Sequence, residues 1–284
     1  MIGNRCIGQR IARALCAWVL LFVISAGVRA QEGKGERLEV SGESLLDDYH
    51  QHVGLTYNAQ AKVQAAYLWR GLYCGAMNVQ GSANVGYGGL YVDMWWNIGT
   101  EDWTFKHFQP EVDLTLGFSR WGIDIYALYI HNFKHGFFDM AYYDRGRNAL
   151  EVGARYTVSS KLPLSILWAT RFTDADSYVI ERVTGDGLPV TDTIHAYSSY
   201  AEISYTWHLP SGFSLYGAIG MTPWKSLYTG YQGGAALQNV EVRLRKDWDM
   251  GNRCGMMVQG QIAVNPSAAV NVINLNATVG VYLK

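Results

Sequence analysis

The chain has 284 residues, of which 49% are hydrophobic and 17% are charged, and its formal net charge is −1. This length suits one or two soluble domains or a single barrel. The balanced charge argues against a nucleic-acid-binding protein, because such a surface needs an excess of basic residues on one face.

Residues 1–30 have the composition of a secretory signal peptide. Three arginines precede an apolar run over residues 14–24, and the segment ends with a small residue at Ala30. The run is shorter than the roughly 18 apolar residues that a membrane-spanning helix needs. We expect cleavage between Ala30 and Gln31, which leaves a mature chain with 19 basic and 24 acidic residues.

The residues that follow the signal peptide fall into two parts. Residues 31–53 are polar and show no periodicity, so we expect a periplasmic tail there. From residue 54 to residue 284 apolar and polar residues alternate along successive segments, which is typical of strands with two different faces. We therefore assign residues 54–284 to one β-barrel domain.

Twelve strands are expected in this domain. In the last of them, Ile273 and Leu275 lie on one face and Asn274 and Asn276 on the other. The segment 123–133 fits the alternation less well, because it is apolar on both faces. The expected strands are 55–70, 77–87, 90–98, 111–118, 123–133, 150–158, 162–173, 196–208, 213–221, 239–245, 256–264 and 273–281.

The connections between these strands alternate in length. Short turns follow the even-numbered strands, as at Gly88-Gly89, whereas several odd-numbered strands are followed by long loops. Transmembrane barrels have short periplasmic turns and long outer loops, so both ends of the barrel domain are expected on the periplasmic side. Within the longest loop, residues 178–183 and 188–193 flank Gly185-Asp186-Gly187 and are expected to pair as a hairpin above the membrane.

The number of strands decides which face of each strand points inward. Eight strands leave an interior that side chains can fill, but the small apolar residues of this chain could not fill a barrel of twelve. Turned outward, the apolar faces meet lipid, and closure of the barrel satisfies every backbone hydrogen-bonding group. The expected fold is therefore all-β: a transmembrane, antiparallel, up-and-down β-barrel of about 12 strands in the outer membrane of a Gram-negative bacterium.

The polar faces of the strands carry charged residues that would then line a pore. Rings of charged side chains select the solutes that pass through such channels. Because the two signs are nearly balanced, no strong ion selectivity is expected; the alternative is that these residues pair across the lumen and close it. The candidate pore-lining residues are Lys62, Arg70, Asp93, Asp113, Arg155, Arg171, Glu202, Glu241, Arg243 and Arg245.

Short motifs in the first third of the barrel domain resemble one family of porins. They are an aromatic-Arg-Gly sequence at 69–71, Gln-Gly at 80–81, Gly-Leu-Tyr-Val at 89–92 and Glu-Val-Asp-Leu at 111–114. Over residues 63–120 this series resembles the TorF-type porin family. The resemblance implies an outer-membrane barrel that conducts small solutes.

Other chemistries find little support in the sequence. His131 and His135 are not placed on one face by a helix, and zinc sites need three or four convergent ligands, so no metal site is expected. Ser199 and His131 lie three strands apart, too far for the hydrogen-bonded pair that a hydrolase requires, so no enzyme is expected. No cofactor is expected, because the sequence carries no cofactor motif. We expect Cys74 and Cys254 at opposite rims of the barrel, beyond the reach of a disulfide.

Two hypotheses from different classes remain. The first is a passive, porin-like channel for small polar solutes. The second is a closed structural barrel, or one that binds a ligand or a partner protein, because its outer loops are rich in aromatic residues such as Trp103, Phe137 and Tyr228. The expected partners are outer-membrane lipid, the barrel-assembly machinery and small solutes, without nucleic acid; the oligomeric state is left open.

Overall fold

The structure is a computed structural model that describes residues 54–100, 108–132, 148–172, 176–251 and 253–283. The expected signal peptide and periplasmic tail lie outside the described residues. Twelve strands form the barrel: β1 (Leu55–Gln64), β4 (Asn78–Tyr87), β5 (Leu90–Thr100), β6 (Phe108–Arg120), β7 (Ile123–Asn132), β8 (Asn148–Thr157), β9 (Leu164–Arg171), β12 (Ser199–Leu209), β13 (Phe213–Thr222), β14 (Ala236–Gly251), β15 (Cys254–Val264) and β16 (Ile273–Leu283).

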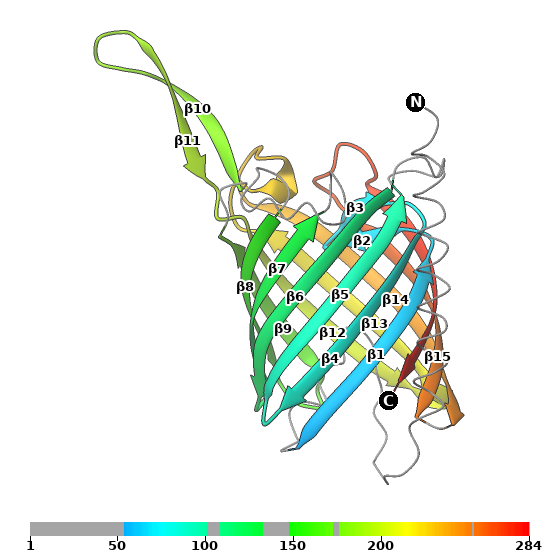
Figure 1. Cartoon of the computed structure of the whole chain (residues 1–284). Helices are drawn as coiled ribbons and strands as arrows, with labels where there is room; N and C mark the ends of the chain where they lie inside the picture. The colour runs from blue at the N-terminus through cyan, green and yellow to red at the C-terminus, as the bar shows by residue number, and fades with distance from the viewer. Residues whose placement is uncertain (1–53, 101–107, 133–147, 173–175, 252, 284) are drawn as a thin grey trace, which may run out of the picture.

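The strands close into the antiparallel barrel that the sequence predicts (Figure 1). Each barrel strand pairs with its sequence neighbour in the barrel, and β1 closes the ring against β16. The closing seam joins six residue pairs, from Ala59–Leu283 to Gln64–Thr278, whereas β1 and β4 share ten. The predicted number of strands and their up-and-down order are confirmed.

The two faces of the wall differ in chemistry as expected. On β16, Ile273 and Leu275 are 67% and 69% exposed to the outside, while Asn276 and Thr278 are buried in the interior. The same alternation recurs on the other barrel strands, so a belt of exposed aliphatic and aromatic residues surrounds the barrel. Such a belt matches hydrocarbon, and the chain is therefore an outer-membrane β-barrel. Among the described residues, no helix is long and apolar enough to cross a membrane.

Glycines on the interior face allow tyrosine rings to lie flat against the wall. Gly117 lies directly across from Tyr91, and Gly153 directly across from Tyr126. A Cβ atom on either glycine would come within 2.3 Å or less of the ring of its tyrosine. A larger residue at these positions would therefore push the ring into the lumen.

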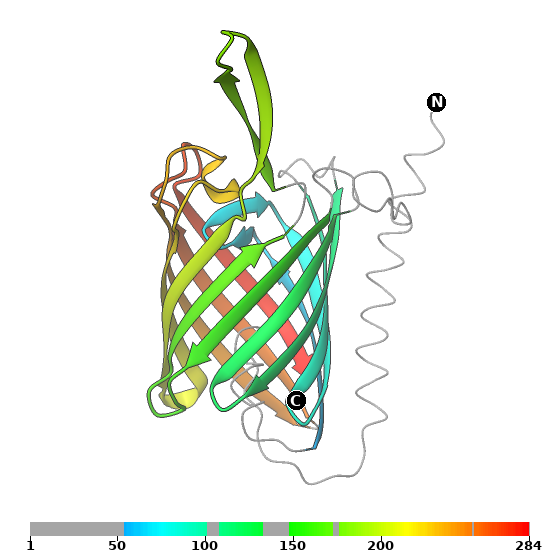
Figure 2. The ribbon, with the colours of Figure 1, turned by 90° about the vertical axis from the view of Figure 1, so that its left-hand side faces the viewer.

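The first predicted strand is wrong in its last part. The barrel strand β1 ends at Gln64, and the chain then turns inward, where the amide of Ala66 donates to Oδ1 of Asn276 on β16. Residues 67–75 form a separate hairpin of β2 (Tyr67–Trp69) and β3 (Leu72–Gly75). Figure 2 shows this hairpin, in cyan, within the upper end of the barrel. We call it the inner hairpin.

A second extra hairpin projects from the same end of the barrel (Figures 1 and 2). It consists of β10 (Ser177–Val183) and β11 (Pro189–His195), which pair with each other over seven residues and with no other strand of the described chain. This outer hairpin confirms the pairing predicted for residues 178–193. The two cysteines of the described chain, Cys74 on β3 and Cys254 at the start of β15, are both free.

Candidate functional site

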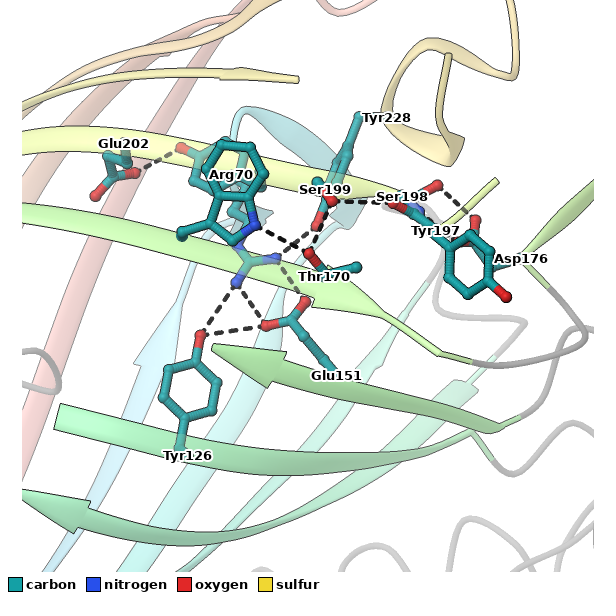
Figure 3. A network of polar contacts seen from close by, with 12 residues as sticks. Arg70, Tyr126, Glu151, Thr170, Asp176, Tyr197, Ser198, Ser199, Glu202 and Tyr228 are labelled. Atoms are coloured by element: carbon teal, nitrogen blue, oxygen red, sulfur yellow. Dashed lines mark hydrogen bonds and ion pairs between the residues drawn. The ribbon is translucent and has the colours of Figure 1, made fainter. Parts of the chain in front are cut away.

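The inner hairpin reaches two distant parts of the barrel wall. Its turn is formed by Arg70 and Gly71, both with positive φ. Gly71 lies so close to β14 that a Cβ atom would come 2.2 Å from the carbonyl oxygen of Gln238. Arg70 points instead toward β8, as Figure 3 shows. The hairpin therefore extends across the mouth of the barrel and does not follow its wall.

A buried ion pair holds the turn of the inner hairpin. The two terminal nitrogens of Arg70 donate to the two carboxylate oxygens of Glu151 on β8, each at 2.7 Å (Figure 3). Nη1 of Arg70 also donates to the hydroxyl of Tyr228, at 2.5 Å. The Glu151 side chain is 0% exposed and that of Arg70 is 10% exposed. Bidentate, buried pairs of this kind are among the strong polar contacts in proteins.

Aromatic rings enclose the same guanidinium group. The Cζ atom of Arg70 lies 4.7 Å from the ring centre of Trp69 and 4.8 Å from that of Tyr200 on β12. A second arginine contacts the same indole ring: the Cζ atom of Arg171 on β9 lies 4.9 Å from the ring centre of Trp69. Cation–π contacts of this geometry are strongest where water is excluded. They add to the ion pair in fixing the hairpin.

The two arms of the inner hairpin have contacts of their own. The hydroxyl of Tyr67 donates to Oε1 of Glu111 on β6 at 3.2 Å, and its ring packs 5.6 Å from that of Trp95. Leu72 packs on a buried cluster that includes Tyr200 and Tyr228. The hairpin is thus bound on three sides by polar and apolar contacts.

An outer loop completes the enclosure. The short 3-10 helix η2 (Leu227–Thr229) carries Tyr228, whose backbone carbonyl accepts a hydrogen bond from Gln238 at 2.9 Å. Burial raises the pKa of the Tyr228 phenol above its usual value, although Arg70 opposes the rise. The Tyr228 hydroxyl therefore keeps its proton at physiological pH. The loop is therefore part of the structure that holds Arg70.

A group of buried hydrogen bonds links this loop to the base of the outer hairpin (Figure 3). The buried carboxylate of Asp176 accepts hydrogen bonds from the amide and the hydroxyl of Ser198, both at 2.5 Å. The hydroxyl of Ser198 in turn accepts the amide hydrogen of Leu227, at 2.7 Å. Tyr231 also donates to Asp176, and burial together with this carboxylate raises the pKa of Tyr231 to about 12. These hydrogen bonds therefore connect the η2 loop to the residues at the base of the outer hairpin.

The ten candidate pore-lining residues do not form one cluster. Nine lie on the interior-facing register of barrel strands, whereas Arg70 lies on the inner hairpin and not, as predicted, on the first barrel strand. The nine wall residues are distributed as follows: Lys62 on β1, Asp93 on β5, Asp113 on β6, Arg155 on β8, Arg171 on β9, Glu202 on β12, and Glu241, Arg243 and Arg245 on β14.

One part of the interior wall is closed by its own hydrogen bonds. Glu202 accepts from the hydroxyls of Tyr200 and Tyr216, at 2.5 and 2.9 Å. Arg243 donates to Glu241, and Arg245 donates twice to Asp247. The network continues across β15 and β16 to β1. We call the inward residues of β12–β16 the hydrogen-bonded wall; its further links are Asn239–Tyr200, Gln261–Glu241, Asn276–Gln261 and Thr278–Gln64.

The neighbouring part of the interior has the opposite character. On β1 and β4–β7, eight inward side chains each carry a buried polar atom without a hydrogen-bond partner in the described part of the chain. Six of these atoms are oxygens that can only accept. We call this surface the acceptor wall; the atoms are Asn58 Oδ1, Asn78 Oδ1, Gln80 Nε2, Asp93 Oδ1, Asn97 Oδ1, Asp113 Oδ1, Ser119 Oγ and Asp124 Oδ2.

Several groups around the inner hairpin carry no distinguishing signal in the sequence. Glu151 and Glu111 belong to the polar faces of predicted strands, so alternation alone would have placed them in the interior. Tyr126 and Tyr228 could not be found in this way, because their roles depend on Arg70. That residue is 81 positions from Glu151 and 158 from Tyr228.

Metal and hydrolytic chemistry find no new support. Within the described ranges, no group of three or more His, Cys, Asp or Glu residues is placed to hold a metal ion. The hydroxyl of Ser199 lies 2.8 Å from that of Thr170, its neighbour on β9. His131 is on β7, which β8 and β9 separate from the strand of Ser199.

Comparisons with known proteins give a likeness of fold. No family model matches the sequence, and no curated protein matches it. Among solved structures, the NanC porin is similar with a TM-score of 0.44 and 10% identity, over 81% of this chain and 100% of that one. The KdgM porin gives 0.41 and 6% over 80% and 98%, and an outer membrane channel from Pseudomonas putida F1 gives 0.43 and 11% over 83% and 97%. By its own closed barrel, apolar exterior and polar-lined interior, the chain is an outer-membrane β-barrel.

Proposed function

We propose that this barrel is a channel through which small polar solutes cross the outer membrane, with the inner hairpin as its constriction. One observation carries the proposal: every one of the twelve barrel strands carries polar side chains on its interior face. A wall of this kind needs water beside it, because buried polar groups without partners are costly. In this proposal the nine wall residues and Arg70 line the path.

The closed barrel is the second candidate, and the inner hairpin is the observation that favours it. The pair of Arg70 and Glu151 fixes the hairpin across the mouth, and aromatic rings pack around its guanidinium group. In that case the barrel would act through its outer surface. The two candidates differ in whether the constricted mouth still passes ions.

We also propose, from the motifs over residues 63–120, that the chain is a member of the TorF-type porin family, that the barrel-assembly machinery inserts it, and that it has no catalytic role. These proposals rest on the sequence. The channel can be tested independently of them.

Single-channel recording in planar lipid bilayers tests the channel directly. Stable conductance steps are expected from the purified full-length mature protein, and their absence would favour the closed barrel. A matched pair of variants ties the current to the lumen. Thr115→Trp adds bulk to the interior and should reduce the step size, whereas Leu116→Trp adds it to the outside, where Leu116 is 60% exposed, and should leave the step unchanged.

A further inference from the structure

The charged groups of the interior are compensated unevenly. Most of its arginines have an acidic partner: Arg70 binds Glu151, and Arg243 and Arg245 bind acids on their own strand. Arg155 lies directly across from Asp124 on the adjacent strand. The even count of charges in the sequence predicted no strong ion selectivity. Pairing changes the balance between positive and negative charge in the interior. A larger share of the basic groups than of the acidic groups has a partner of opposite charge.

Two aspartates of the acceptor wall lie close together on adjacent strands. Asp93 on β5 faces Thr115, and Asp113 on β6 faces Trp95, so the two aspartates are diagonal neighbours on the interior face. Diagonal neighbours in a sheet have Cα atoms roughly 7–8 Å apart. Each aspartate has one carboxylate oxygen that no donor of the described chain reaches.

Neutral side chains elsewhere on the acceptor wall add further oxygens of the same kind. Asn97 is 3% exposed, lies directly across from Glu111 and has an unpartnered Oδ1. Asn78, 2% exposed, also has an unpartnered Oδ1. Buried polar atoms that the protein leaves without a partner mark places where water or an ion completes the structure. Since acceptors outnumber donors here, that partner should be a donor or a cation.

The bases that border the acceptor wall do not reverse this balance. Lys62 lies across from Gln80 at its edge on β1. Arg171 lies directly across from Glu151 and over the ring of Trp69. Near the mouth, Glu111 adds a third carboxylate beside Asp113 on β6.

We propose that solutes cross the barrel along the acceptor wall and that this route favours cations over anions, with Asp93 and Asp113 as the residues that set the preference. The solutes in question are small monovalent cations, either inorganic ions or organic ammonium ions. Such cations bind to carboxylate and amide oxygens. The hydrogen-bonded wall offers fewer open acceptors, because its polar groups are used by one another. This inference rests on the proposed channel function and adds to it both a route and a class of solute.

The reversal potential in a potassium chloride gradient tests the preference. The wild-type channel should show a permeability ratio of potassium to chloride above one. In D93N/D113N, which removes both charges and keeps the side-chain shape, the ratio should fall by roughly two- to fourfold, because selectivity depends on the fixed charges beside the path. The matched control is E181Q/D186N, which removes two acids from the outer hairpin and should leave the ratio unchanged.

The outcomes separate this inference from the channel proposal. A conducting wild-type channel with a ratio of one or below, or a ratio that D93N/D113N leaves unchanged, would overturn the cation route while the channel stands. An equal fall in the control variant would also overturn it, because the charges would then act from outside the barrel. Absence of conductance would overturn the channel itself. The wild-type ratio is measured without any variant, so the test does not depend on the folding of D93N/D113N.

Discussion

The inner and outer hairpins both add to the regular barrel, and they differ in what their side chains contact. The inner hairpin is short, with three and four residues in its strands, yet its side chains contact β6, β8, β9, β12 and the η2 loop. The outer hairpin has seven residues in each strand, and most of its side chains are exposed. The longer strand pairing belongs to the hairpin with fewer tertiary contacts.

This difference shows that strand pairing and tertiary contact are separate sources of order. An isolated two-stranded hairpin is at best marginally stable in water. The outer hairpin must rely on its ladder and on exposed pairs such as Arg182 and Asp192, whose side chains are 61% and 43% exposed. The inner hairpin relies on a buried ion pair and on aromatic packing. A change to one hairpin can therefore be tested with the other hairpin as its control.

The largest effect is expected from removal of the inner hairpin. If residues 67–75 are replaced by a short Gly-Ser connection between β1 and β4, the constriction is lost and single-channel conductance should rise several-fold. Replacement of residues 178–194 of the outer hairpin by a similar connection should leave conductance unchanged. Equal conductance in the two deletion variants would show that the inner hairpin does not limit the current.

The next effect concerns the ion pairs of the two hairpins. Arg70→Ala leaves the buried carboxylate of Glu151 uncompensated, which should destabilise the docked hairpin by about 3–5 kcal/mol. Arg182→Ala removes an exposed pair worth about 0–1 kcal/mol. Hydrogen exchange of the amides over residues 67–75 and 177–195 measures both effects. A small change for Arg70→Ala would mean that the aromatic contacts alone hold the hairpin.

A smaller effect is expected at the turns. Gly71 and Gly187 both have a positive φ, of +77° and +79°, so alanine should cost about 1–2 kcal/mol of strain at either position. Only Gly71 also faces a clash, because its Cβ would lie 2.2 Å from Gln238 O, whereas nothing lies within 4 Å at Gly187. Gly71→Ala should therefore loosen its hairpin more, as amide exchange would show. Equal effects would indicate that the turn of the inner hairpin shifts freely.

The sequence predicted the barrel because one physical requirement shapes every strand. Lipid outside and water inside impose the same alternation of apolar and polar residues on each strand. The pair Ile273 and Asn274 therefore indicates an outward and an inward face in the same way as pairs on the other strands. The segment 123–133, apolar on both faces, forms β7 because Leu128 and Ile130 are tolerated in the interior. Strand number, order and facing all follow from this repeated pattern.

The inner hairpin could not be found in the same way. The alternation runs on past Gln64 through Tyr67 and Trp69, because a hairpin with two different faces has the same period as a barrel strand. The inward turn depends on Asn276, 210 positions away from Ala66. Similarly, Arg70 was expected in the interior, but its partner Glu151 becomes adjacent only when the barrel closes. Contacts of this range leave no local pattern.

The closing seam has a consequence for mechanics. β1 and β16 share six residue pairs, so in the described chain Leu55–Asn58 pair with β4 on one side only. Fewer ladder bonds must break there than at the ten-pair junction of β1 and β4. Under load, or when a new strand is offered from outside, the ring should open first at the junction of β1 and β16.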